Sequence, residues 1–192
     1  PRVAPPPRRP APPPPVMPVA PPPTDAEVRE EAQEKAVALL YDAGVALRNG
    51  DEDAAIAAFT EALRYDPSSY SAYTNRGSTY LGRGDYDLAI ADFTAAIRLQ
   101  PDQARAYTNR ARAYRKKGDL DAAIADYTKA IELDDRLAAA YFFRGECYYE
   151  KGDLEAALKD YEATLKLNKK DRQAKQRRKE VQQQLKGKGK GG

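Results

Sequence analysis

The stretch that decides the fold is SAYTNRGSTY at residues 71–80, because the chain reads RAYTNRARAY thirty-four residues later, at 105–114. The same interval separates Gly84, Gly118 and Gly152, and an aspartate follows each of them. Glycine permits a left-handed helix end and aspartate caps the start of the next helix, so each unit reads as two helices around a Gly-Asp turn. Two short helices cannot bury their apolar faces alone, so this period predicts hairpins that stack on one another.

Small and aromatic residues recur at the same interval. The alanine series is Ala55, Ala89, Ala123 and Ala157, and the aromatic series four residues further on is Phe59, Phe93, Tyr127 and Tyr161. Pro67 and Pro101 stand where the second helix of a unit should end, because proline cannot continue a helix. The repeat therefore specifies both the packing residues and the helix ends.

This pattern resembles the tetratricopeptide repeat (TPR), in its spacing most like bacterial members of the family. The second repeat matches every place of the motif, with Tyr73, Gly77, Tyr80, Gly84, Ala89, Phe93, Ala96 and Pro101. The third repeat has Asp135 where proline is expected, and the fourth departs at Thr164 and Lys169. The resemblance implies an all-α fold, a right-handed α-solenoid of four helix-turn-helix units within a TPR domain at 24–171. The expected repeats lie at about 36–69, 70–103, 104–137 and 138–171.

The first repeat is looser than the others. Gly44 and Gly50 are six residues apart where the later repeats have seven, which predicts an inter-helix turn that is one residue shorter. The run Thr24-Asp25-Ala26-Glu27 is a capping box, so a helix should begin there and reach about Arg48. Apolar residues at helical spacing continue from Val28 to Leu47.

The two ends of the chain differ from its middle. Residues 1–23 hold 13 of the 15 prolines and predict an extended, disordered tether, with a ligand for a proline-reading domain as the alternative. A polar helix at 172–185 is expected to cap the stack, and the Lys/Gly run at 186–192 to form a flexible tail. Basic residues dominate both ends, so the folded body between them is acidic although the net charge is only +3.

Two series of opposite charge run through the last three repeats. At the seventh place stand Arg76, Arg110 and Arg144. At the twenty-third place stand Asp92, Asp126 and Asp160. The first repeat has Ala43 and Ala58 there instead, so the two charges occur together or not at all. This predicts a structural salt bridge between the two helices of each of these repeats.

The TPR resemblance implies that the first helices line a concave groove that binds a peptide. The residues predicted to line it are Thr74, Asn75, Ser78, Arg105, Thr108, Asn109, Arg112, Arg115, Phe142, Phe143, Glu146 and Tyr149. Asparagine amides both donate and accept hydrogen bonds and can hold a peptide backbone, and arginines prefer carboxylates. The expected ligand is an extended or helical segment of another protein with acidic residues. The alternative is that the asparagines only solvate a helix face.

Related proteins that clamp a C-terminal carboxylate use five residues at set places of three repeats. Only Asn75 matches this set, and Arg105 comes close to matching, so binding of a chaperone tail is not expected.

The composition argues against an enzyme. The chain has no histidine, one cysteine and no Gly-rich phosphate loop, so it lacks the usual general base and the commonest metal ligand. Cys147 lies in an apolar stretch and reads as a core residue. No catalytic residue, metal, cofactor or small-molecule substrate is predicted.

The predicted function is a scaffold for protein–protein contacts. One alternative is a structural module that self-associates, by stacking end to end or by dimerising. Another is binding of nucleic acid or an anionic surface through the basic tail, which is disfavoured because no aromatic residue lies among Lys175–Lys179 to stack on bases. No apolar run is long enough for a transmembrane helix. The Pro/Ala tether and the missing initial methionine favour the bacterial periplasm or cell envelope over the cytoplasm.

Overall fold

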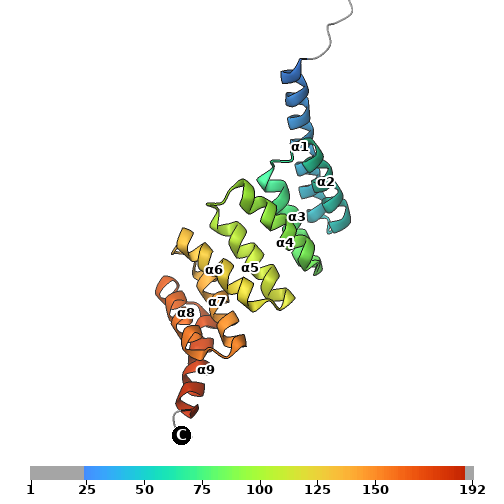
Figure 1. Ribbon diagram of the computed structural model, residues 1–192. Coiled ribbons are helices and arrows are strands. Elements are labelled where there is room, and N and C mark those ends of the chain that lie inside the picture. The colour runs from blue at the N-terminus through green and yellow to red at the C-terminus, as the bar shows by residue number, and fades with distance from the viewer. Residues whose placement is uncertain (1–23, 189–192) are drawn as a thin grey trace, which may run out of the picture.

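The computed structural model describes residues 24–188, and this part of the chain is entirely helices and short turns. Its nine helices form four sequential antiparallel pairs followed by a single helix, which confirms the predicted solenoid of four units and a capping helix (Figure 1). The pairs are α1 (Asp25–Arg48) with α2 (Glu52–Tyr65), α3 (Tyr70–Arg83) with α4 (Tyr86–Leu99), α5 (Ala104–Lys117) with α6 (Leu120–Leu133) and α7 (Ala138–Lys151) with α8 (Leu154–Leu167).

The single helix, α9 (Arg172–Lys188), packs on α8 at the opposite end of the stack from α1 (Figure 1). The Asp171 side chain accepts a hydrogen bond from the Ala174 amide at 2.9 Å and caps its start. The helix continues three residues beyond the predicted end at Leu185, into the predicted Lys/Gly tail. The proline-rich tether at 1–23 and residues 189–192 of that tail lie outside the described residues.

The glycines of the last three turns behave as predicted, and the aspartate caps do so in two of the three, since the Asp85 side chain makes no cap hydrogen bond and lies 3.1 Å from Arg83 Nε instead. Gly84, Gly118 and Gly152 end their helices with left-handed φ angles of 90°, 93° and 82°. Asp119 and Asp153 each accept a hydrogen bond from the third amide of the helix that follows. A side chain other than glycine would be strained at these left-handed positions, which explains why glycine recurs there.

The first unit differs from the expectation. The turn between α1 and α2 has three residues, one more than the later turns rather than one fewer. Ala43 is fully buried and lies seven residues before Gly50, so it occupies the place that Gly77 has in the second unit. The spacing from Gly44 was therefore the wrong measure, and the 34-residue frame is unbroken. In this frame Asp42, not Ala43, stands at the seventh place.

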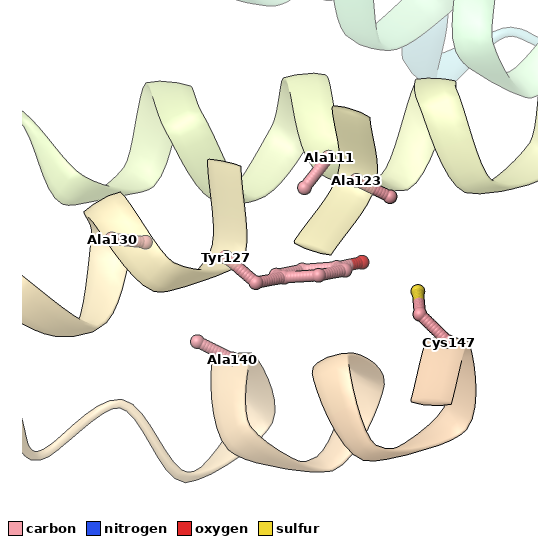
Figure 2. Close-up of a cluster of buried hydrophobic side chains, with 6 residues drawn as sticks. All are labelled: Ala111, Ala123, Tyr127, Ala130, Ala140 and Cys147. Atoms are coloured by element: carbon pink, nitrogen blue, oxygen red, sulfur yellow. The ribbon is translucent and has the colours of Figure 1, made fainter. Parts of the chain in front are cut away.

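The core consists of aromatic rings packed among alanines. Phe59, Phe93, Tyr127 and Tyr161 are at most 1% exposed. Figure 2 shows the Tyr127 ring of α6 between the alanines of α5 and α6 on one side and Ala140 and Cys147 of α7 on the other. Burial of such a ring stabilises the fold by about 2–3 kcal/mol, and the next repeat supplies part of the surface that covers it.

Helix α1 is only partly covered. Its N-terminal half extends past α2 (Figure 1), and Val28 and Val37 are 52% and 60% exposed. Only Ala36 and Ala43 are buried, so the predicted apolar stripe contacts the stack in its C-terminal half alone. Within residues 24–188, no helix combines the length and the apolar character that a membrane span needs.

The predicted salt bridges are confirmed, and each is bidentate. In the third unit, the Arg110 Nε and Nη2 atoms donate to Asp126 Oδ2 and Oδ1 at 2.7 and 2.8 Å. Nη1 donates to Thr94 Oγ1 of the preceding unit at 3.0 Å, a contact that was not predicted. The same arrangement joins Arg76 to Asp92 and Thr60, and Arg144 to Asp160 and Thr128. The arginine thus links the helices of one repeat and also links that repeat to the one before it.

Tyrosine rings flank each of these guanidinium groups. Tyr107 and Tyr114 have their ring centroids 5.8 and 5.9 Å from the Arg110 Cζ atom, at cation–π distance. The series continues at Arg178 in α9, thirty-four residues after Arg144, without an aspartate partner. Its Nε atom is buried and makes no hydrogen bond within the described part of the chain.

Candidate functional site

The predicted groove residues lie on α3, α5 and α7, the first helices of three consecutive units, which contact one another in order. Two adjoining hollows lie on this groove face and share Ser78 as a wall. The amide hollow, of about 230 Å³, is lined by Tyr70, Ser71, Thr74, Asn75, Ser78, Arg105 and Asn109. The arginine hollow, of about 330 Å³, is lined by Ser78, Leu81, Gly82, Arg112, Arg115, Lys116, Tyr127 and Phe143.

The amide hollow contains two kinds of polar side chain. The hydroxyls of Thr74 and Ser78 donate to carbonyls of their own helices, so their hydrogen atoms are already used, and Thr108, which is outside this hollow, is bonded in the same way. The side-chain amides of Asn75 and Asn109 make no hydrogen bond within residues 24–188. They therefore remain able both to donate and to accept, as do the hydroxyls of Ser71 and Tyr70, for which the described residues provide no hydrogen-bond partner.

The arginine hollow contains one cation that is paired with a carboxylate and two that are not. Arg115 donates to Glu150 Oε1 at 2.5 and 3.0 Å, and its Cζ atom lies 5.9 Å from the Phe143 ring centroid. Arg112 and Lys116 are exposed and have no ion-pair partner among the described residues. This part of the groove face therefore has positive charge that no described acidic side chain neutralises.

Tyr127 belongs to the arginine hollow but was predicted only as a core residue. It is fully buried, and its hydroxyl oxygen has no hydrogen-bond partner in the described structure. Burial raises the pKa of this hydroxyl well above its usual value, although the nearby positive charges of Arg115 and Arg112 oppose the effect. The ring lies between α5 and α7 (Figure 2). It stacks on Phe143 with ring centroids 6.3 Å apart.

The end of the predicted groove at α7 is covered by the chain itself. Glu146 is 7% exposed, and its Oε1 atom accepts from the Tyr161 hydroxyl at 2.6 Å. The Arg177 Nε atom of α9 lies 2.9 Å from the same oxygen, and Arg115 Nη2 lies 3.7 Å from Oε2. The carboxylate of Glu146 is thus bonded internally.

Helix α9 also covers Tyr149. Arg177 has its Cζ atom 5.0 Å from the Tyr149 ring centroid, and Gln184 donates to the Tyr149 hydroxyl at 2.9 Å. Phe142 and Phe143 pack edge to face with ring centroids 5.3 Å apart, and both border a hollow of about 500 Å³ between α7 and α9. The structure therefore brings the aromatic residues together, with α9 as one wall.

The contribution of α9 to this face was missed in the sequence. A usable signal was present, because Arg177 follows Phe143 by thirty-four residues and so continues the groove-facing series. Tyr127 also carried a signal, because a tyrosine replaces the phenylalanine of the first two units at a buried place. A hydroxyl at such a place needs a hydrogen-bond partner.

The remaining candidate groups are inert or dispersed. Burial raises the pKa of the Cys147 thiol to about 12, so it stays protonated near neutral pH and is a core residue as predicted. Within residues 24–188, no three His, Cys, Asp or Glu side chains are placed to hold a metal ion.

The chain belongs to the tetratricopeptide repeat family. The model of this family, described as Tetratricopeptide repeat, matches residues 43–104, 74–138 and 108–173, which together cover more than half of the chain. Members of the family mediate protein–protein interactions. A comparison with curated protein sequences finds no significant match.

Several solved structures have the same fold. A structure of MamA is 28% identical over 77% of this chain and 84% of its own, with a TM-score of 0.72. The first TPR of Spaghetti (RPAP3), bound to the HSP90 peptide SRMEEVD, is 30% identical over 60% of this chain and 92% of its own, with a TM-score of 0.59. YrrB, at 22% identity and a TM-score of 0.69, covers 84% of this chain and 83% of its own and is similar in fold.

Proposed function

We propose that this chain is a non-enzymatic interaction scaffold that binds an acidic segment of a partner protein along the face formed by α3, α5 and α7. The observation that carries the proposal is the unpaired charge of α5. Arg105, Arg112 and Lys116 border the two hollows and have no ion-pair partner in residues 24–188. Carboxylates of a bound segment would neutralise this charge, and arginine can bind a carboxylate through two parallel hydrogen bonds.

The two free amides support an extended ligand. Asn75 and Asn109 occupy equivalent places of consecutive repeats and border the same hollow. Each can donate to a peptide carbonyl and accept from a peptide amide, which holds a backbone without selecting its side chains. These amides would hold the backbone of the ligand. The neighbouring cations would give the preference for acidic side chains.

The TPR of Spaghetti (RPAP3) holds the HSP90 peptide SRMEEVD, which contains two consecutive glutamates. This relative supports an acidic segment as the class of ligand. Of the clamp residues expected for a C-terminal tail, the present chain has Asn75 alone, with Arg105 close to a second. We therefore favour an acidic segment other than that tail.

Charge reversal tests this function. We compare capture of partner proteins from a native lysate by the wild-type chain, by a variant with Arg105→Glu and Arg112→Glu, and by a control with Arg98→Glu. Arg98 is an exposed residue of α4 outside both hollows, so this control applies half of the double variant's charge change without altering the groove face.

The expected result is a protein that the wild type and the Arg98 variant capture and the double variant does not. A synthetic acidic segment of that protein should then bind the wild type directly, with an affinity that falls as salt is added. Equal capture by all three chains would contradict the proposal.

Self-association is the second candidate function, and an exposed apolar pair on α1 favours it. Val37 and Tyr41 lie four residues apart on one face of the helix and are 60% and 69% exposed. A mass measurement over a concentration series distinguishes the two. Dimers or longer stacks at micromolar concentration, abolished by Tyr41→Glu, would favour assembly, whereas a monomer throughout would exclude it.

A further inference from the structure

Two tyrosines at equivalent places of the third and fourth units have opposite environments. Tyr161 donates its hydroxyl hydrogen to Glu146, the residue fifteen positions before it. The residue fifteen positions before Tyr127 is Arg112, which cannot accept a hydrogen bond. The same position relative to the ring thus holds a carboxylate in one unit and a cation in the other.

The Tyr127 hydroxyl is consequently a buried donor without an acceptor among residues 24–188. A buried hydroxyl that lacks a partner is unfavourable, because it has lost its hydrogen bonds to water. It also lies at the wall of a hollow of about 330 Å³ that is lined by the unpaired cations Arg112 and Lys116. A missing acceptor and unpaired positive charge therefore occur at one place.

From this coincidence we infer that the arginine hollow binds one carboxylate of the acidic segment, with the Tyr127 hydroxyl as hydrogen-bond donor and Arg112 as ion-pair partner. The inference rests on the proposed function and assigns one carboxylate of the ligand to one site. The fourth unit contains the template for it, because Glu146 accepts from Tyr161 and lies 2.9 Å from the Arg177 Nε atom. A ligand carboxylate would accept from Tyr127 as Glu146 accepts from Tyr161, with Arg112 as the cation because Phe143 stands at the place of Arg177 one repeat earlier.

The walls of the hollow suit an acidic side chain. Leu81 and Phe143 are apolar and can pack against its methylene groups. A neutral amide could accept from Tyr127 but would leave the charge of Arg112 uncompensated. Since the hydroxyl oxygen is out of contact with solvent, the carboxylate must displace a side chain to reach it, and Arg112 is exposed and unrestrained by an ion pair.

Three short synthetic peptides serve as probes, titrated into the full ¹⁵N-labelled chain and followed by NMR. They are acetyl-Ala-Ala-Glu-Ala-Ala-amide, the same peptide with glutamine in place of glutamate, and an acetylated pentaalanine with a free C-terminal carboxylate. We expect the glutamate peptide to shift the backbone signals of Arg112 and Lys116 and to bind about tenfold more tightly than the glutamine peptide. Binding of pentaalanine alone at these signals would support the carboxylate site and identify a chain end as its source.

Two matched variants assign the effect to the hydroxyl. Tyr127→Phe removes only the unpartnered oxygen, and Phe93 at the equivalent place of the second unit shows that phenylalanine fits there. This variant should weaken binding of the glutamate peptide about fivefold to tenfold and leave the glutamine peptide unchanged. Tyr161→Phe, the control, should not change either affinity. Equal affinities of the glutamate and glutamine peptides together with no binding of pentaalanine, or full affinity in Tyr127→Phe of the peptide that binds the wild type, would overturn the inference.

The two proposals can fail separately. If charge reversal on α5 abolishes partner capture but Tyr127→Phe retains full affinity for the glutamate peptide, the scaffold function stands and the carboxylate site is wrong. If partner capture is indifferent to α5 while the glutamate peptide still depends on Tyr127, the hollow binds carboxylates but is not where the partner binds.

Discussion

The third and fourth repeats each have two helices, an Arg–Asp bridge and a buried tyrosine at the same places. They differ in what surrounds the tyrosine hydroxyl. In the fourth repeat, Glu146 and Arg177 fill the space in front of Tyr161. In the third, Arg112 leaves Tyr127 without an acceptor beside a hollow. The comparison teaches that the packing residues of a repeat determine its fold, whereas the residue fifteen positions before the tyrosine determines whether the tyrosine hydroxyl has a partner among the described residues.

The strongest way to break both repeats is to remove the shared bridge. Asp126→Ala and Asp160→Ala should each lower the free energy of unfolding by about 2–4 kcal/mol, because each leaves a partly buried arginine without its counter-charge. Urea denaturation followed by circular dichroism measures this loss. The two values should agree within about 1 kcal/mol, since the geometry of the bridges is the same.

Arg178→Ala is the control for these bridge variants. Arg178 occupies the equivalent place in α9 but has no aspartate partner within residues 24–188, so we expect a loss below about 1 kcal/mol. A loss as large as that of the aspartate variants would show that the arginine side chain stabilises this place of the repeat even without an ion pair.

The next effect distinguishes the two repeats. Tyr161→Phe should lower the free energy of unfolding by about 1–3 kcal/mol, because it deprives the buried Glu146 carboxylate of a hydrogen bond of 2.6 Å. Thermal unfolding and urea unfolding of this variant should both show a loss of stability. An unchanged stability would mean that water or Arg177 replaces the lost donor.

Tyr127→Phe should have a smaller effect and the opposite sign. Its hydroxyl has no partner among the described residues, so its removal should leave the stability unchanged or raise it by up to about 1 kcal/mol. Differential scanning calorimetry of the variant beside Tyr161→Phe measures the contrast. A clear loss of stability would imply that the hydroxyl is satisfied in solution without a ligand.

Cys147 reports on the contact between these two repeats, since it packs beside Tyr127 from α7. Burial raises the pKa of its thiol to about 12, whereas an unfolded thiol has a pKa of about 8.5. The stability from the protonated thiol is therefore fully present below about pH 8.5 and is lost as the pH rises toward 12.

At pH 8 the folded chain should accordingly react with a thiol reagent only as fast as it opens, with Cys147 modified at once in urea. Cys147→Ala should weaken the alkaline loss of stability slightly, because the nearby tyrosines retain their own dependence on pH. Rapid modification of the native chain would show that the contact between α6 and α7 is looser than in the structure.

Most of the fold could be predicted from the sequence, because stacked repeats must present the same packing residues at a constant interval. The paired appearance of Arg110 and Asp126 even predicted a side-chain contact. The turn after α1 was mispredicted because Gly44 was taken for the packing residue, while burial selects Ala43. The signal was present in the sequence, because Ala43 and not Gly44 lies thirty-four residues before Gly77.

The candidate site was less predictable, because it depends on side chains that meet across repeats. The groove series on α3, α5 and α7 followed from the resemblance, but closure by Arg177 required knowing that α9 stacks as another first helix. The unpartnered state of Tyr127 depends on what lies fifteen residues earlier in its own repeat. The cellular compartment and the binding of the peptide itself stay predictions.

The hydrogen bond from each bridging arginine back to a threonine of the preceding unit gives the rod a mechanical polarity. Helix α2 accepts such a bond at Thr60 from Arg76. Helix α1 has Asp42 at the seventh place and therefore has no bridging arginine. The α1–α2 hairpin therefore accepts a bond from the bridging arginine of the next unit but donates none of this kind itself. Under mechanical force or on heating, the stack should unfold from the α1 end inward. Amide hydrogen exchange should accordingly be fastest in α1 and slow down toward the later units.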